Sequence, residues 1–175
     1  MFRFQGLPPA PFEPFFAMSD TALEAAGARR MVADSMPGFP CRVSLEDAEP
    51  GERLILLNFE HQPAHSPYRA TGPIFVREAA HAAYDGTDVP AVLRPRLLSL
   101  RAYDNAGLMV DADVVDGKDV EALLGRLFAN EETAEIHIHY ARRGCYACKV
   151  ARLRGSFPRE SAVTQPRLNS PPPGR

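Results

Sequence analysis

The chain contains 175 residues, of which 45% are hydrophobic and 24% are charged, so it can bury a hydrophobic core within one domain. Its formal net charge of −2 at pH 7 leaves no basic excess to hold a nucleic-acid backbone, and we expect no nucleic-acid partner. The longest strongly apolar run, Leu54–Leu57, is too short to cross a membrane, and the N-terminal residues show no signal-peptide pattern. We therefore expect a cytoplasmic protein with no membrane partner, whose three cysteines are reduced thiols.

Proline is concentrated at the two ends of the chain. Nine of the 17 prolines lie before residue 15 or after residue 157. From Gly155 onward the sequence has almost no apolar periodicity, which is typical of a disordered segment. The sequence thus predicts a single α+β domain over 1–154 and a disordered proline-rich tail over 155–175.

The first half of the chain alternates short apolar segments with turn residues. Residues 2–16 alternate aromatics with prolines and are expected to form an extended arm. A short helix is expected over about 20–26, because Ser19 or Asp20 can cap its start and Gly27 can end it. Residues 54–59 are apolar on both faces, which indicates a central strand. Further strands are expected at 29–34, 41–45 and 74–77, with loops at 61–72 and 78–89.

A β-hairpin is expected in the second half, with strands over 97–103 and 108–115. The turn residues 105–107 fit a three-residue loop in which Gly107 adopts the left-handed conformation. That register places three pairs on the core-facing side: Leu98 with Val114, Leu100 with Ala112, and Ala102 with Val110. It also sets Asp111 opposite Arg101, and we expect these two side chains to form a cross-strand ion pair.

An amphipathic helix is expected over 118–129, after the N-cap candidate Asp116. Its apolar residues recur at i, i+3, i+4, i+7 and i+8, and they are Val120, Leu123, Leu124, Leu127 and Phe128. Two more strands are expected over 134–141 and 145–151. Because strands outnumber helices and most connections suit hairpins, the sequence predicts an α+β fold with a mainly antiparallel sheet.

Two histidines alternate with apolar residues in the segment 136–140. On a strand, His137 and His139 share one face about 6.6 Å apart, and imidazoles at that spacing can bind one metal ion. A catalytic zinc site needs a third protein ligand, and the candidates are Asp111, Asp113, His61 and His65. The alternative is a half-solvated face on which both histidines bind acidic neighbours or water. The sequence thus predicts no cofactor and leaves a divalent metal ion open, and no nucleotide-binding glycine loop occurs.

Cys41 is a candidate nucleophile. It follows a tight turn and precedes Arg42, whose charge can lower the pKa of the thiol. His61, His65 or His139 would serve as the general base of such a pair. The alternative is a buried thiol in the core, where cysteine is common.

The remaining cysteines spell C-x-x-C at Cys145 and Cys148. Redox motifs of this kind place the first thiol at a helix N-terminus, whereas these residues lie on an expected strand. Positions i and i+3 of a strand point to opposite faces, so we expect no dithiol chemistry here.

The segment 60–69 concentrates polar side chains between two expected strands, where scaffolds often place binding groups. Arg69, Arg42 and Arg143 can form a clamp for a carboxylate or phosphate, with Tyr68 beside Arg69. The alternative is that these arginines form surface ion pairs, which contribute about 0–1 kcal/mol each.

Several irregular motifs occur in an order that is familiar from a small family. They are residues 37–48, 60–63 with 66–69, 74–78, 110–113, and 137–139 with 143–146. On these motifs, over about residues 2–152, the chain resembles the domain of unknown function 1203 family of small bacterial proteins. The resemblance implies no activity, because the family has none assigned. Cys148 and the residues after about Leu153 depart from the family pattern, which argues further against a C-x-x-C function.

Three functional hypotheses remain open. The leading one is a small-molecule-binding protein or enzyme whose polar pocket takes an anionic ligand. In it, Cys41, His61 and His139 are catalytic, and Arg42, Arg69, Arg143 and Tyr68 bind substrate. The second is a metal-dependent enzyme that uses His137 and His139. The third is a non-enzymatic interaction module whose proline-rich tail docks on a partner.

Overall fold

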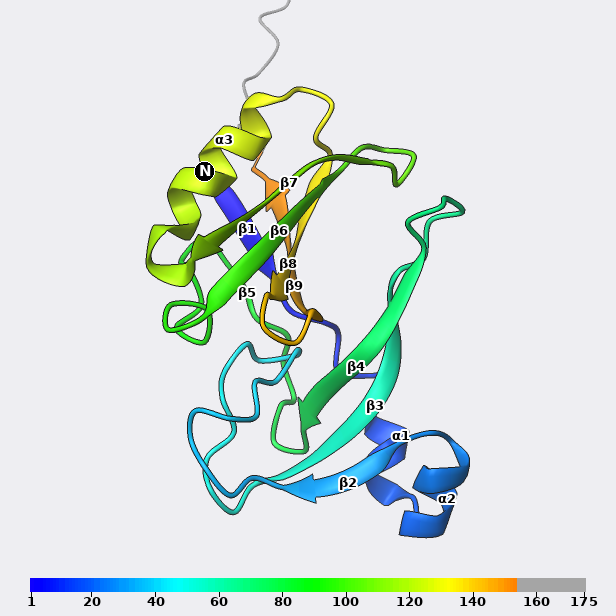
Figure 1. Cartoon of the computed structure of the whole chain (residues 1–175). Coiled ribbons are helices and arrows are strands. Elements are labelled where there is room, and N and C mark those ends of the chain that lie inside the picture. The colour runs from blue at the N-terminus through cyan, green and yellow to red at the C-terminus, as the bar shows by residue number, and fades with distance from the viewer. Residues whose placement is uncertain (154–175) are drawn as a thin grey trace, which may run out of the picture.

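The computed structural model describes residues 1–153, which form two antiparallel sheets and three α-helices (Figure 1). The larger sheet contains, in spatial order, β5 (Asp85–Gly86), β1 (Phe2–Gln5), β9 (Cys145–Arg152), β8 (Glu135–Tyr140), β6 (Leu97–Tyr103) and β7 (Met109–Asp116). The smaller sheet contains β2 (Arg29–Val32), β3 (Arg53–Gln62) and β4 (Ala70–Arg77). The expected α+β class with mainly antiparallel strands is confirmed.

Three helices accompany the sheets: α1 (Glu13–Ala17), α2 (Asp20–Ala25) and α3 (Val120–Ala129). No helix within the described residues is long and apolar enough to cross a membrane. The tail expected over 155–175, and the partner docking assigned to it, lie outside the described residues.

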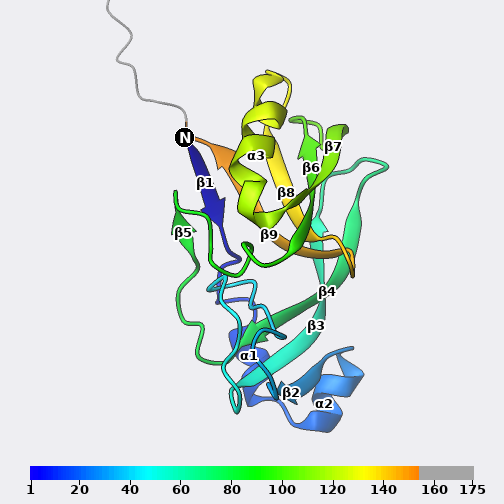
Figure 2. The ribbon, with the colours of Figure 1, turned by 60° about the vertical axis from the view of Figure 1, so that its left-hand side comes forward.

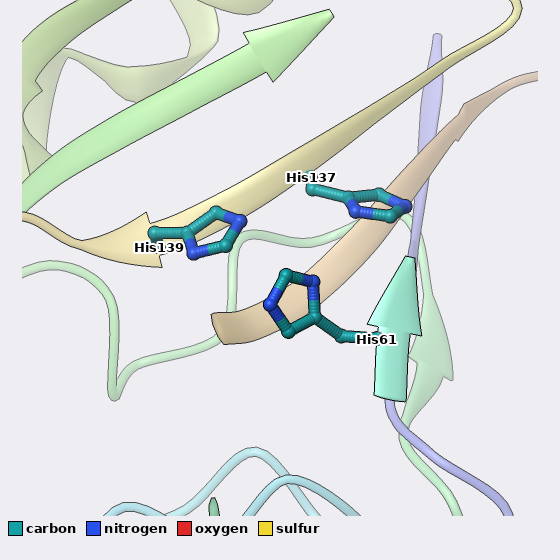
Figure 3. Close-up of side chains that lie close together, drawn as sticks. All are labelled: His61, His137 and His139. Carbon is teal, nitrogen blue, oxygen red and sulfur yellow. The ribbon is translucent and has the colours of Figure 1, made fainter. Parts of the chain in front are cut away.

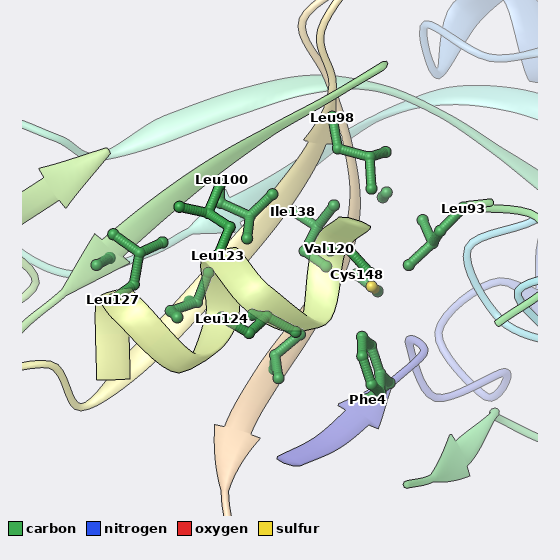
Figure 4. Close-up of a cluster of buried hydrophobic side chains, with 14 of the residues drawn as sticks. Phe4, Leu93, Leu98, Leu100, Val120, Leu123, Leu124, Leu127, Ile138 and Cys148 are labelled. Carbon is green, nitrogen blue, oxygen red and sulfur yellow. The ribbon is translucent and has the colours of Figure 1, made fainter. Parts of the chain in front are cut away.

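Helix α3 covers one face of the six-stranded sheet. All five apolar residues predicted for it are buried: Val120, Leu123, Leu124, Leu127 and Phe128. They pack against Leu98 and Leu100 of β6 and Ile136 and Ile138 of β8, in the larger hydrophobic core (Figure 4). The 3-10 turn Gly117–Asp119 leads the chain from β7 into the helix.

The β3–β4 hairpin extends from the smaller sheet along the opposite face of the larger one. In Figure 1 it rises on the side away from α3, and Figure 2 shows the same arrangement from another direction. The tips of two hairpins are joined, because Ser66 Oγ donates to the carbonyl oxygen of Gly107 at 2.8 Å. The larger sheet is therefore covered on one face by a helix and on the other by a hairpin.

The N-terminal arm expected over 2–16 is only partly extended. Residues 2–5 form β1, which pairs with both β9 and β5, and Phe2 stacks on Phe128 with ring centroids 5.3 Å apart. Residues 13–17 form α1 instead of extended chain. Pro14 lies in the first turn of this helix, where its missing N–H leaves no hydrogen bond unmade.

The short helix expected over about 20–26 is α2. Its N-cap is Ser19, whose side chain accepts a hydrogen bond from the backbone N–H of Ala22 at 3.2 Å. Gly27 follows the helix with φ of 70°, the left-handed conformation in which glycine ends helices.

No strand forms over 41–45. Only isolated bridges occur there, because the chain folds back on itself: the N–H of Cys41 binds the carbonyl of Glu46, and the N–H of Arg42 binds that of Phe75. Leu45 has a φ of 53°, which no extended strand contains. The expectation of a strand at this position was wrong because Cys41 and Val43 pack into the core of the smaller sheet while Leu45 packs into the larger core, so the segment turns between the two.

The loop expected over 61–72 is also shorter than predicted. β3 continues to Gln62 and β4 begins at Ala70, so only residues 63–69 connect them. The sequence pattern did not predict these strand ends, because their side chains are polar. In the structure these side chains face the larger sheet instead of an apolar core.

The register of the β6–β7 hairpin differs from the predicted one beyond its turn. Gly107 has the expected left-handed φ of 75°, and Tyr103 pairs with Met109. A bulge then leaves Val110 without a partner, so Ala102 pairs with Asp111 and every later pair shifts by one residue.

The shift overturns the predicted ion pair between Arg101 and Asp111. Arg101 pairs instead with Ala112 across the sheet. Arg126 of α3 binds Asp111 and Asp113 at 2.9 Å each, and so ties the helix to the edge strand.

Two glycines near α3 provide a matched test of this packing. A Cβ on Gly117 would collide with the carbonyl oxygen of Leu93, whereas a Cβ on Gly125 would meet nothing within 4 Å. We expect Gly117→Ala to lower the free energy of unfolding by about 1–3 kcal/mol, as overpacking does. We expect Gly125→Ala to raise it by about 0.5–1 kcal/mol, because alanine favours a helix interior. Urea unfolding followed by circular dichroism measures both, and equal stabilities of the two variants would contradict this packing.

Candidate metal centre

Three histidines from the two sheets meet between the β3–β4 hairpin and the larger sheet (Figure 3). His137 and His139 project from β8 on the face opposite α3, as strand alternation predicts. His61 reaches them from the end of β3. His137 and His139 are only 2% and 0% exposed, so the hairpin removes both rings from solvent.

A β-bulge positions His61. In the β3–β4 pairing, Glu60 lies opposite Thr71 and Gln62 lies opposite Ala70, which leaves His61 as the extra residue. A bulge of this kind bends the strand and re-aims a side chain. The imidazole of His61 is thereby turned toward β8 instead of continuing the regular alternation of β3 (Figure 3).

A second bulge positions Tyr146 beside the histidines. In the β8–β9 pairing Ala147 is the extra residue, so His139 lies opposite Tyr146. The ring of Tyr146 is stacked on that of His61, with centroids 5.1 Å apart and planes at 6°. It also meets His137 edge to face at 5.4 Å. The buried phenol ring therefore forms a rigid wall of the cluster.

The three histidines present a compact set of nitrogen atoms. One ring nitrogen of each histidine lies within 4.8 Å of the corresponding atoms of the other two. Each ring also has a buried nitrogen without a hydrogen-bond partner: Nδ1 of His61, Nδ1 of His137 and Nε2 of His139. Such atoms are rare in folded proteins, and leaving one unsatisfied costs about 1–3 kcal/mol.

The opposite nitrogens of two rings are held by acceptors. Nε2 of His137 lies 3.0 Å from Oε1 of Glu135, and Nδ1 of His139 lies 3.0 Å from the carbonyl oxygen of Gly144. Lys149 Nζ lies 3.5 Å from the second oxygen of Glu135. Carbonyl and carboxylate oxygens only accept, so both held nitrogens carry hydrogen, and in the neutral form of each ring the unpartnered nitrogen is the one with the lone pair.

Burial keeps two of the rings uncharged. It lowers the pKa of His61 to about 4, with smaller electrostatic contributions from His137 and Arg101. It lowers the pKa of His139 to about 3, with Arg101 acting in the same direction and the Gly144 carbonyl opposing it. Neutral imidazole is the form that binds metal ions, and both rings are in that form at pH 7.

A pocket of about 590 Å³ opens beside the cluster. His61, His137 and Tyr146 lie in its wall, together with Glu60, Glu135 and Lys149. Its volume is within the range of small-molecule sites, about 300–1,000 Å³. The pocket gives a metal ion or a small molecule a route from solvent to the buried rings.

The residues that the sequence proposed for one site are distributed over several places. Of the candidates for a third ligand, His61 is the one that joins His137 and His139. His65 is exposed in the loop that connects β3 and β4, and Asp111 and Asp113 bind Arg126.

Cys41 lies in the hydrophobic core of the smaller sheet, 0% exposed. Its sulfur accepts hydrogen bonds from the backbone N–H groups of Val43 and Arg77 at 3.4 Å each. No hydrogen bond within residues 1–153 joins it to a histidine, so the structure does not bring the proposed Cys–His pair together.

The proposed arginine clamp is divided. Arg42 and Arg143 line one pocket, which is separate from the histidine pocket. Arg69 instead forms an exposed ion pair with Glu60 at 2.5 Å. Tyr68 is 41% exposed, and its ring lies edge to face with Tyr103 at 6.4 Å.

Sequence analysis overlooked Glu135, Tyr146 and Tyr140. The position of Glu135 could have been predicted, since alternation places residue 135 on the same strand face as His137 and His139. Tyr146 was not, because only the bulge at Ala147 sets it opposite His139. Tyr140 lies on the apolar side of the strand, and strand alternation gives no signal for its buried, unpartnered hydroxyl.

Fold and site together define an α+β protein with a buried cluster of three histidines at the junction of two antiparallel sheets. A family model described as protein of unknown function (DUF1203) matches residues 38–152, so the chain belongs to that family. This match confirms the resemblance found in the sequence motifs, and it spans all three histidines. No curated protein and no solved structure matches the chain.

Thiol labelling tests the environments of the cysteines. Cys41 and Cys148 are buried, and burial raises the pKa of Cys148 to about 12, whereas Cys145 is partly exposed. We expect a maleimide at neutral pH to label one thiol of the folded wild-type protein and none of folded Cys145→Ser. After denaturation, all three thiols of the wild-type protein should be labelled. Mass spectrometry counts the labels. Rapid labelling of folded Cys145→Ser would show that Cys41 or Cys148 is reachable.

Proposed function

We propose that this protein is a metal-dependent enzyme whose metal ion, of the zinc class, is bound by His61, His137 and His139. The observation that carries the proposal is the convergence of three buried, unpartnered imidazole nitrogens from two sheets. Three histidines and an open fourth position are typical of catalytic zinc. In such a site the metal polarises a substrate oxygen or lowers the pKa of bound water to about 7.

The partners of the histidines support metal binding. A carboxylate or backbone carbonyl on the far nitrogen of a ligating histidine fixes its tautomer and orientation. Glu135 does this for His137 and Gly144 does it for His139. The same hydrogen bonds leave the inner nitrogens as lone pairs, so these two rings need no rearrangement of protons to become ligands.

The spacing requires a modest closure of the rings. Tetrahedral zinc with bonds of 2.0–2.1 Å needs nitrogens about 3.3 Å apart. The nitrogens here lie within 4.8 Å of one another, so the widest pair must close by about 1.5 Å. The ring centroids lie 5.0, 6.1 and 6.5 Å apart, with His137 and His139 the most separated, so the side chains on β8 must turn together with that of His61.

Charge at the site favours an anionic substrate. Three neutral imidazoles leave the charge of a divalent ion uncompensated, and Glu135 offsets one unit of it. Arg101, which lies opposite His137 on β6 and has no ion-pair partner within residues 1–153, adds a further positive charge. A carboxylate, phosphate or hydroxide at the open position would complete this balance.

Metal analysis tests the proposal directly. Tag-free protein purified without chelator and supplied with zinc is expected to carry about one zinc ion per chain by elemental analysis. We expect less than about 0.1 ion per chain in His61→Gln, His137→Gln and His139→Gln, because two histidines hold zinc weakly. His65→Gln and His81→Gln are matched controls outside the cluster and should keep full occupancy. The proposal is refuted if wild type takes up no zinc, copper, iron or nickel, or if the three variants bind as wild type does.

The variant Glu135→Gln tests whether Glu135 orients His137 for metal binding, without removing any of the three proposed ligands. The amide is nearly the same size as the carboxylate but removes the charge that faces His137 and Lys149. We expect zinc affinity to fall by about 10–100-fold while one site per chain is retained. Competition with a chromophoric chelator measures this change. Affinity equal to wild type would show that Glu135 does not orient a ligand.

A further inference from the structure

A second pocket, of about 440 Å³, lies where the β8–β9 turn, the start of β6, the β3–β4 hairpin and the segment 38–42 meet. Its lining residues are distinct from those of the histidine pocket. Four arginines line it: Arg42, Arg96, Arg142 and Arg143. No aspartate or glutamate does.

Most of this positive charge is uncompensated. Arg96 binds Asp47 at 2.7 Å. Arg42, Arg142 and Arg143 take part in none of the ion pairs within the described residues. Three unpaired guanidinium groups in one concave, partly apolar site create a field that attracts anions.

Arg42 is held rigidly at the base of the pocket and is 2% exposed. Its Nε donates to the carbonyl of Tyr146 at 2.7 Å, and its Nη1 donates to the carbonyl of Pro40. These bonds fix the side chain but supply no negative charge. A buried guanidinium without a carboxylate is costly to desolvate, and burial lowers the pKa of Arg42.

Tyr140 gives the second, independent indication of a ligand. Tyr140 is 8% exposed, and the guanidinium groups of Arg42 and Arg96 lie over its ring, 5.1 and 5.3 Å from the ring centroid. Its hydroxyl is buried and has no hydrogen-bond partner. A tyrosine hydroxyl carries its proton at pH 7 and can donate it in a hydrogen bond. The hydrogen bonds of Arg42 to two backbone carbonyls give that side chain a structural role. The hydroxyl of Tyr140 has no such role within residues 1–153.

We propose that this pocket binds a small organic anion, with a carboxylate or phosphate head group on an apolar body. The head group accepts from the Tyr140 hydroxyl and neutralises Arg42, Arg142 and Arg143. The body packs on the apolar wall formed by Leu56, Pro73 and Phe75. The site is distinct from the metal centre, because the two pockets have no lining residue in common and binding of the anion needs no metal ion.

Calorimetric titration of the full-length, tag-free and chelator-treated protein tests this site. The probes are benzoate, phenyl phosphate, neutral benzyl alcohol and inorganic phosphate. We expect benzoate or phenyl phosphate to bind with a Kd below about 1 mM. Benzyl alcohol lacks the charge and inorganic phosphate lacks the apolar body, so each should bind at least about tenfold more weakly. The tighter of the two organic anions identifies the head group.

Two pairs of variants assign the binding to this pocket. Tyr140→Phe removes only the unpartnered hydroxyl. We expect it to lower the affinity for the organic anion by about tenfold, with no loss of stability to urea. Tyr68→Phe makes the same change on an exposed tyrosine outside the pocket and should bind as wild type. Arg143→Gln should weaken binding severalfold, while Arg29→Gln, an exposed arginine outside the pocket, should not.

Several results would overturn the proposal. Absence of binding by both organic anions at 10 mM, roughly tenfold above the expected Kd, would exclude the site. Equal affinity for benzyl alcohol would make the pocket a purely apolar one. Equal affinity for inorganic phosphate would remove the role of the apolar wall. Unchanged binding by both Tyr140→Phe and Arg143→Gln would place the bound anion elsewhere on the protein.

Discussion

The packing of the β3–β4 hairpin against the larger sheet is the interaction on which the rest of the structure depends. Without it, His137 and His139 would lie on a solvated sheet face. With it, both rings are buried and His61 is carried into contact with them. The hairpin tip is held close by Gly107, where a Cβ would collide with Ala64, and by the bond from Ser66. A fold that buries polar groups in this way gives up stability to do so.

Buried polar atoms without a hydrogen-bond partner occur mainly at the two candidate sites. Within the described residues, six side chains have a buried polar atom without a partner: His61, Gln62, Arg77, His137, His139 and Tyr140. All but Arg77 line the histidine pocket, belong to its cluster or line the arginine pocket. Arg77 is satisfied through its other nitrogens, which bind Glu46 and Glu52 at 2.7 Å. Buried polar atoms without a protein partner that cluster at pockets, instead of scattering through the core, are typical of ligand-binding sites.

The local sequence pattern predicted correctly the elements that pack against a single apolar surface. Helix α3 has one apolar stripe on one sheet, and its five buried residues followed from spacing alone. The facing of His137 and His139 followed from strand alternation. Pattern failed where a bulge or a second sheet intervenes. The bulge at Val110 changes which residues meet Asp111, and the one at His61 selects the third member of the cluster from four candidates. Bulges depend on pairing across strands, so no single segment of sequence encodes them.

Strand β8 contributes neighbouring residues to both candidate sites. His139 and Tyr140 are consecutive, so alternation turns the imidazole toward the hairpin and the phenol toward the α3 side of the sheet. The turn that follows continues this division. The Gly144 carbonyl holds His139, while Arg142 and Arg143 line the other pocket. An anion bound between those arginines would therefore rest on the same turn that orients a histidine of the cluster, and any displacement of the turn reaches both sites through the backbone.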